Sequence, residues 1–320
     1  MKALHKTLLP VALLALWTSA AAAQPEGAAP AFSGRIEAGA AYINTTDPLF
    51  ARGDRTADDL DGPADASGAV LPVALFDLRY RSEASGTEVF LGTPLETSTV
   101  RLTLGVGRSW QGVGTVTAAA LADPWAEVWK DPYRVGAERD ATGAPEYGGR
   151  VGWEGIAGTG AGISYTGMHT RVDDDAAGER LEALRRSGWT HEIELGYQVP
   201  LLPGLLLTPS VATAVGDLDG TAEAFRRYEG KLSVLLARER FMAHVFLATG
   251  CTRYREEHPD FGERRHDGSL GGGAMVTVPR LFGVPSLFAD LVASYGVRDS
   301  NLGFFDARTT VAAVALGYAL

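Results

Sequence analysis

Residues 309–320, the last of the chain, read T-T-V-A-A-V-A-L-G-Y-A-L and carry no charge. Successive side chains of a strand point to opposite faces, so this pattern predicts one apolar face and one face of small residues. A terminal strand of a soluble domain frays easily, whereas the last strand of an outer-membrane barrel must close the cylinder. We predict a closing strand whose apolar face is the C-terminal signal for membrane insertion, formed by Val314, Leu316, Tyr318 and Leu320.

The same period-two alternation recurs along most of the chain in segments of about ten residues separated by turn residues. Helical periodicity is confined to residues 179–186 and, weakly, 125–130. The sequence predicts an all-β fold, a transmembrane antiparallel up-and-down β-barrel of about 14 strands, with 12 or 16 as alternatives. The predicted strands are 35–43, 71–81, 87–93, 99–107, 114–121, 150–154, 162–172, 189–199, 205–215, 227–236, 241–254, 266–278, 287–298 and 309–320.

Connections after even-numbered strands are mostly short and those after odd-numbered strands are mostly long. Short periplasmic turns and long extracellular loops are typical of outer-membrane barrels, while a soluble β-sandwich has no reason for the asymmetry. Aromatic residues near strand ends fit interfacial girdles better than a buried sandwich core. They are Tyr42, Tyr80, Trp153, Trp189, Tyr197, Tyr228, Tyr295 and Tyr318.

The N-terminus has the three parts of a secretory signal peptide: basic residues, a short apolar core interrupted by Pro10, and an A-A-A cleavage pattern before Gln24. We predict a signal peptide at 1–23, a periplasmic leader at 24–33, and an outer-membrane barrel at 34–320 of a Gram-negative cell. The net charge of -10 argues against a nucleic-acid partner. The single cysteine, Cys251, excludes an intrachain disulfide.

A barrel of this size is roughly 28 Å across at the backbone and leaves a bore of about 10 to 15 Å. Two interpretations of the mixed-sign inner face stay open: a hydrated channel for small polar solutes, or charges that pair across strands and line a closed lumen. Residues 123–147 are the candidate for an inward-folding constriction. The lumen-lining candidates are Glu37, Asp77, Arg79, Arg101, Arg150, Glu154, Glu192, Glu194, Arg227, Glu229, Lys231, Asp290 and Arg298.

The histidines provide a second hypothesis, a hydrolase at the barrel rim that acts on lipid A or phospholipid. His169 and His191 are expected to be neighbours on one hairpin, with Ser164 or Ser187 as nucleophile. No histidine has a zinc-ligand spacing, and a surface loop explains H-P-D-F-G-E-R-R-H at 258–266 without metal. We therefore predict no enzyme activity, no catalytic residue, no metal and no cofactor. Acidic loops at 54–65 and 173–175 are candidates for collecting divalent cations at a lipopolysaccharide surface, although solvated loops need no such role.

Three stretches, together with G-R-I-E-A-G-A at Gly34, resemble a known family: W-K-D-P-Y-R-V-G-A-E-R-D-A-T at 129–142, H-P-D-F-G-E-R-R-H-D at 258–267 and D-S-N-L-G-F-F-D at 299–306. The chain is similar to the domain of unknown function 2860 family of uncharacterised proteobacterial outer-membrane proteins. The resemblance implies a single barrel domain and no known substrate or catalytic residue. The chain ends in Leu320, whereas the commonest ending of outer-membrane barrels is a terminal Phe.

The sequence thus predicts a porin-like channel for small polar solutes. A non-conducting barrel for surface interaction or envelope structure is the alternative, and the rim hydrolase is the second alternative. The expected partners are outer-membrane lipid and lipopolysaccharide, the barrel assembly machinery and small solutes.

Overall fold

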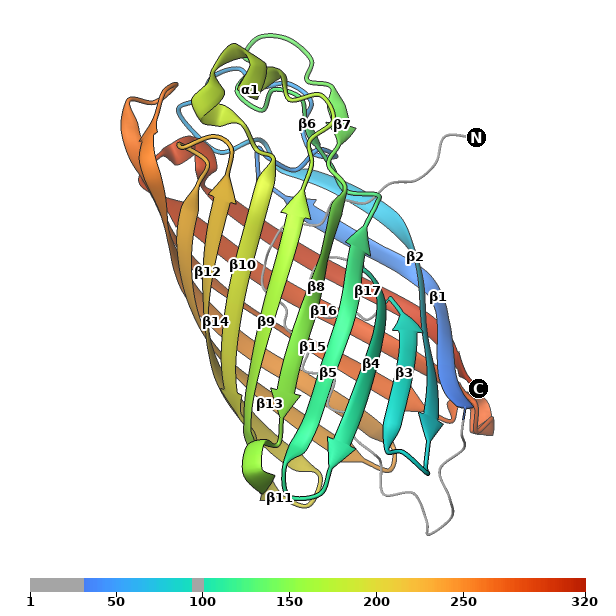
Figure 1. The fold of residues 1–320 in the computed structure, drawn as a ribbon. Coiled ribbons are helices and arrows are strands. Elements are labelled where there is room, and N and C mark those ends of the chain that lie inside the picture. Colours follow the sequence, from blue (N-terminus) through green and yellow to red (C-terminus); the bar gives the residue numbers. More distant parts are fainter. Residues whose placement is uncertain (1–31, 94–100) are drawn as a thin grey trace.

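The computed structural model describes residues 32–93 and 101–320, and nearly all of its regular structure is antiparallel strand (Figure 1). Fourteen strands form one closed up-and-down barrel, which confirms the predicted fold class and strand number. The strands are β1 (Phe32–Thr45), β2 (Ser67–Ser82), β3 (Thr87–Gly92), β4 (Leu102–Trp110), β5 (Gly114–Asp123), β8 (Glu146–Glu154), β9 (Ala161–Thr170), β10 (Gly188–Tyr197), β12 (Leu205–Leu218), β13 (Phe225–Arg238), β14 (Phe241–His258), β15 (Glu263–Pro279), β16 (Leu287–Ser300) and β17 (Ala307–Ala319).

The barrel closes where β1 pairs with β17, so the predicted closing strand occupies its expected place. The register runs from Arg35 opposite Ala319 to Thr45 opposite Thr309. The hydroxyl oxygens of these two threonines are 2.8 Å apart. The short strand β11 (Val199–Leu202) follows β10 after a break, and among the described strands it pairs with β12 alone. It is short because Pro200 has no backbone N–H to donate and because the chain turns at Gly204, where φ is positive.

Long and short connections gather at opposite ends of the barrel (Figure 1). We call these the loop end and the turn end. At the turn end the strands join through tight turns, such as the one at Gly86, whose positive φ of 62° suits glycine. At the loop end lie residues 46–66, 124–145, 171–187, 219–224, 259–262 and 301–306, together called the cap.

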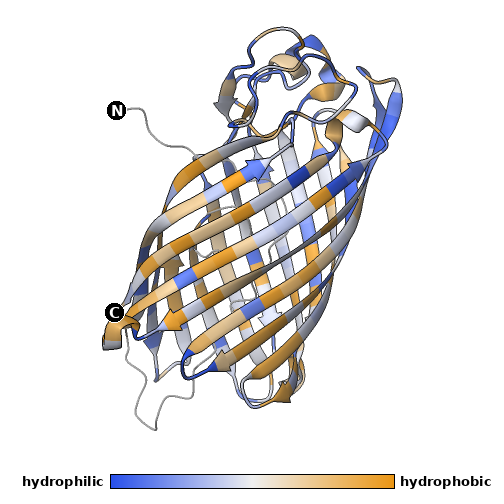
Figure 2. Ribbon diagram, turned by 180° about the vertical axis from the view of Figure 1, so that it is seen from behind, coloured by the Kyte–Doolittle hydropathy of each residue, from blue (hydrophilic) through white to orange (hydrophobic). Residues whose placement is uncertain are grey.

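The strands alternate between exposed apolar side chains and less exposed polar or small ones, and Figure 2 shows the alternation in hydropathy along the wall of the barrel. In β17, for example, Leu316 is 59% exposed while its neighbour Ala315 is 8% exposed. The apolar side chains point outward, and all the aromatic residues assigned to girdles are exposed. An exposed apolar belt bordered by aromatic rings is the surface that a transmembrane barrel presents to lipid.

Several boundaries differ from the sequence predictions. Strand β1 begins at Phe32, so Phe32 and Ser33, assigned to the leader, belong to the strand. The helical prediction at 125–130 was wrong, because β6 (Glu127–Trp129) pairs there with β7 (Ala141–Gly143). The helical prediction at 179–186 was shifted: α1 covers Ala176–Arg180, since the Asp175 side chain caps its start, and a 3-10 turn follows at Glu182–Leu184.

Some predictions lie outside the described residues. These are the signal peptide, the leader up to residue 31, and the start of the fourth strand at residues 99 and 100. Among the described residues, no helix is long and apolar enough to cross a membrane.

Candidate functional site

The inner face of the barrel wall carries charged side chains that pair with opposite charges on the same strand or on a neighbouring one. On β1 to β3, Arg35 contacts Glu37 at 3.1 Å, and Arg79 contacts both Asp77 at 3.0 Å and Glu88 at 2.8 Å. Asp77 and Glu37 are 7% and 6% exposed. This sector therefore holds three predicted residues together with Arg35 and Glu88, which the sequence analysis left out.

A second charged sector lies on β8, β10 and β13. The guanidinium of Arg227 contacts the Glu192 carboxylate at 2.8 Å, and the ammonium of Lys231 lies 3.5 Å from the Glu194 carboxylate. Arg150 reaches the same Glu194 at 3.9 Å. One carboxylate thus lies between two cations from different strands, which orients all three side chains along the inner wall.

The remaining lumen-lining candidates are spread along the wall. Arg101 contacts Glu146 at 2.8 Å, and Asp290 accepts a hydrogen bond from the Thr277 hydroxyl. Arg298 contacts Asp47 of the first loop at 2.7 Å. Glu154 is exposed at the turn end of β8, away from the charged sectors.

A cavity of about 200 Å³ lies inside the wall of β13 to β17, just beneath the cap. Its polar lining includes Glu229, the last of the predicted residues, and threonine and serine hydroxyl groups. A larger hollow of about 750 Å³ lies on the outer wall instead, among apolar side chains such as Val106 and Tyr165, and is not part of the lumen. The charged residues that line the inner cavity are Asp47, Arg227, Glu229, Arg265, Asp267 and Arg298.

The cap has a hydrophobic core of its own, which the sequence analysis missed. Its centre is Tyr133, whose ring lies 5.7 Å from that of Phe304 and 4.7 Å from that of His258. The rings of Phe304 and Phe305 are 5.0 Å apart, and both side chains are buried. Apolar side chains of four other cap loops pack around these rings, so the loops form one folded unit.

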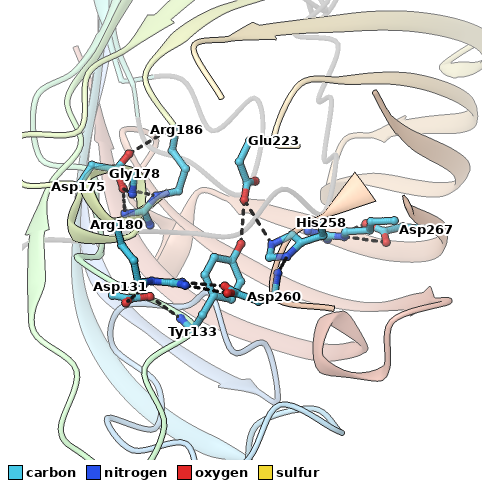
Figure 3. Close-up of polar contacts among 11 residues, drawn as sticks. Asp131, Tyr133, Asp175, Gly178, Arg180, Arg186, Glu223, His258, Asp260 and Asp267 are labelled. Atoms are coloured by element: carbon cyan, nitrogen blue, oxygen red, sulfur yellow. Dashed lines mark hydrogen bonds and ion pairs between the residues drawn. The ribbon is translucent and has the colours of Figure 1, made fainter. Parts of the chain in front are cut away.

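Polar contacts tie the loops of the cap together (Figure 3). The Tyr133 hydroxyl donates to the Glu223 carboxylate at 2.8 Å. Arg180 donates two hydrogen bonds of 2.7 Å to Asp260, and Arg186 donates to Asp175 and to two backbone carbonyls. Burial raises the pKa of both the Tyr133 phenol and the Glu223 carboxyl, because each charged form loses its hydration inside the cap.

Residues 123–147, expected to constrict the barrel, supply a central part of this cap. Besides Tyr133, they contribute Arg139, which is 1% exposed and donates to the backbone carbonyls of Pro48, Pro132 and Asp54. Its guanidinium carbon lies 5.0 Å from the Trp129 ring centre. This side chain holds the first loop against residues 124–145.

Replacing Tyr133 by Phe should loosen the cap without unfolding the barrel. The change removes only the hydroxyl that bonds Glu223, at a cost of about 1 to 3 kcal/mol. Trypsin cleavage after exposed Arg185 in the cap should therefore accelerate by about 5-fold to 100-fold, because each 1.4 kcal/mol raises the opened population tenfold. The matched control is Tyr147→Phe, since Tyr147 is exposed on the outer wall. Equal cleavage rates in both variants would contradict this role of the hydroxyl.

The rim-hydrolase arrangement is not assembled among the described residues. The rings of His169 and His191 both pack against Trp189, and the His191 Nδ1 is hydrogen-bonded to the Tyr165 hydroxyl at 2.8 Å. The Ser164 hydroxyl accepts from Arg150, and the Ser187 hydroxyl accepts from the Val172 amide. Neither serine is paired with a histidine there.

In the candidate cation-binding loop at 54–65, Asp54 and Asp59 accept hydrogen bonds from the Thr56 and Asp61 amides, and in the loop at 173–175 each acidic side chain pairs with a basic one. Asp173, Asp174 and Asp175 contact Arg171, Lys130 and Arg186, respectively. The ends of the H-P-D-F-G-E-R-R-H stretch point apart, because His258 is buried in the cap while His266 is exposed. In residues 32–93 and 101–320, no group of three or more His, Cys, Asp or Glu side chains could hold a metal ion.

The C-terminal residues assigned to membrane insertion lie on the outer face of β17 and just beyond it. Their exposed fractions are 49% for Val314, 59% for Leu316, 46% for Tyr318 and 53% for Leu320. The Leu320 amide donates to the Gly34 carbonyl at 2.8 Å, which continues the β1–β17 pairing past the end of the strand. Whether these side chains direct insertion remains a prediction.

A family model described as protein of unknown function (DUF2860) matches residues 31–319. The chain belongs to this family. The three sequence stretches that carry the resemblance meet in the cap, where they supply Tyr133, His258 and Phe304. The family model therefore covers the folded cap as well as the barrel wall.

The likeness of the chain to solved outer-membrane structures is distant in sequence. No curated protein matches the sequence. Among solved structures, a loop-deletion mutant of OmpT, an outer membrane protein of Vibrio cholerae, is similar at 9% identity and a TM-score of 0.41, covering 90% of this chain and 98% of that one. The outer membrane channel DcaP of Acinetobacter baumannii is similar at 8% identity and a TM-score of 0.42, with coverage of 90% and 96%. An anion-selective porin from Comamonas acidovorans is similar at 10% identity and a TM-score of 0.39, with coverage of 90% and 98%. No function is transferred from likenesses at this level.

Proposed function

We propose that the protein is an outer-membrane channel for small polar solutes, with the cap narrowing its loop end. The membrane placement is supported by the exposed apolar belt and its aromatic borders. The signal-peptide pattern at the N-terminus supports export. Support for a channel comes from the residues of the inner wall.

The observation that carries the channel proposal is the charged cavity beneath the cap. Its wall presents three arginines and three carboxylates together with several hydroxyl groups. Ionised groups in a dry lumen would pay a large desolvation cost, whereas a hydrated lumen accommodates them. Because cations and anions lie close together there, a neutral or zwitterionic solute fits the cavity better than a strongly charged one.

Single-channel recording in a planar lipid bilayer tests this proposal. We expect discrete conductance steps from the purified full-length barrel. Absence of any step from both the wild type and the Tyr133→Phe variant, whose cap is loosened, would remove the channel proposal.

Two adjacent residues of β14 test whether the current passes through the lumen. Thr252 lines the cavity, while Cys251 is exposed on the outer face. A cationic methanethiosulfonate reagent should leave the wild-type conductance unchanged although Cys251 is present. The same reagent should lower the conductance of a Thr252→Cys, Cys251→Ser variant by about half or more, because the adduct narrows the path. An identical response of both proteins would contradict a path along this wall.

A non-conducting surface barrel is the second candidate function, and the cap favours it. Six connections meet over the loop end around one hydrophobic core, which would restrict entry. Conductance in the Tyr133→Phe variant separates the two candidates. Steps that appear only in this variant would support a cap that closes a channel, and no steps in either protein would support the non-conducting barrel.

A further inference from the structure

Three basic side chains form a continuous row on the outer wall near the loop end. Arg226 of β13 lies directly opposite Arg253 of β14, and Arg253 lies directly opposite His266 of β15. All three are exposed. They point outward, because the intervening residues Arg227 and Tyr254 line the inner cavity.

This arrangement is unfavourable without an anionic partner. Directly opposite residues of an antiparallel pair have Cβ atoms about 4.5 to 5.5 Å apart, and like charges at such positions repel. Within the described part of the chain, neither arginine has an ion pair or a side-chain hydrogen bond. The chain as a whole is acidic, with a net charge of -10, so the unneutralised row is a local exception.

Acidic side chains on the same face do not neutralise the row. Asp217 contacts Arg255, farther along β14, at 3.3 Å. Asp299 lies one outward position nearer the turn end, opposite Gly268. Glu256 accepts a hydrogen bond from the Thr221 hydroxyl at 2.7 Å, beyond the row toward the tip of the hairpin.

The row lies where the headgroups of the outer leaflet are expected. Tyr228, two residues from Arg226, is one of the exposed aromatics that border the belt. One outward position nearer the middle of the belt than the row, Cys251 lies between Tyr228 and Gly268 on the neighbouring strands, and Gly230 follows beyond Tyr228, opposite Thr249. These small outward residues leave room against the wall, and a Cβ at Gly230 would meet no atom within 4 Å.

We propose that Arg226, Arg253 and His266 bind the phosphate groups of a phosphorylated glycolipid in the outer leaflet, whose acyl chains lie along the apolar outer wall below. Arginine suits this partner because its planar fork donates paired hydrogen bonds to phosphate oxygens. The inference depends on the membrane placement in the proposed function but not on conduction. Loss of lipid binding and loss of conductance are therefore separate outcomes.

Native mass spectrometry of the folded barrel with phosphorylated lipid A measures the interaction. Changing Arg226 and Arg253 to Gln together should weaken binding by roughly tenfold for each arginine removed. The charge-matched control is Arg240→Gln with Arg308→Gln. Both control residues are exposed, but Arg240 is at the turn end and Arg308 is on β17, outside the row. Lysine at 226 and 253 keeps the charges but not the paired hydrogen bonds, so its affinity should lie between those of the wild type and the double Gln variant.

Thermal unfolding in detergent provides a readout that does not require the affinity measurement. Without lipid, the double Gln variant should be as stable as the wild type or more stable, because a repulsion is removed. With phosphorylated lipid A, the wild type should gain more stability than the variant. Equal gains in the row variant and the control would overturn the proposal. So would equal binding of dephosphorylated lipid A, or full competition by inorganic phosphate at the same concentration as the lipid, which would assign the site to free phosphate.

Discussion

Replacing Val314 by arginine should prevent most of the protein from reaching its folded, membrane-inserted form. Val314 lies on the outer face of β17, between exposed Tyr318 and the loop end of the strand, and is 49% exposed. A lipid-facing arginine costs about 2 to 4 kcal/mol at the bilayer midplane and less near the interfaces. Leu316→Arg, one outward position nearer the Tyr318 ring, should therefore be less damaging than Val314→Arg.

The inward neighbour Ala315 is the matched control for this face assignment. Ala315→Ser places a hydroxyl on the inner face, across from Asp290, and should be tolerated. Heat-dependent gel mobility of membrane fractions reports the folded barrel in each variant. Equal yields from Val314→Arg and Ala315→Ser would mean that the assigned faces are reversed or that the wall does not contact lipid.

Replacing Gly39 by alanine should weaken the closure of the barrel by about 1 to 3 kcal/mol, the usual cost of overpacking. Gly39 lies opposite Ala315 in the β1–β17 pair. A Cβ at this position would approach the Val314 carbonyl oxygen to 2.0 Å and the Ala315 Cα to 2.6 Å. Both contacts are with backbone, which can move only if the pairing of the two strands shifts.

Gly230→Ala is the control for Gly39→Ala because it makes the same change in another strand of the wall. At Gly230 a Cβ would meet open space. The urea concentration at the unfolding midpoint should fall for Gly39→Ala and change little for Gly230→Ala. A similar midpoint for both variants would show that the seam accommodates the extra methyl group.

The sequence was sufficient to predict the barrel wall because the wall depends on a local, period-two pattern. Lipid on one side and polar groups on the other impose this alternation on each strand, as in β13, where Tyr228 and Leu232 are exposed and Lys231 is buried. Strand number and connection lengths follow from the same pattern. The misplaced helical segment at 125–130 shows where it fails, because a three-residue strand such as β6 is too short to reveal a period.

The cap could not be predicted because its contacts join loops that are far apart in the sequence. Tyr133 and Phe304 lie in two different loops and His258 ends β14, and no periodicity links them. One feature of the sequence could have indicated the cap: its loops contain aromatic residues, which fully solvated loops do not need. The partners of the inner charges could not be predicted either, because the pairing of Arg79 with Glu88 depends on the register between β2 and β3.

The adjacency of β1 and β17 has a consequence for how the molecule forms. Thr45 and Thr309, which meet at this seam, are separated by 264 positions in the chain. Neighbouring strands elsewhere are joined by a turn or a loop and can pair early, but this last pairing must overcome the loop-closure entropy of nearly the whole polypeptide. The final step of folding is therefore also the most non-local one. Until it occurs, both edges of the sheet expose unpaired backbone groups that lipid cannot satisfy.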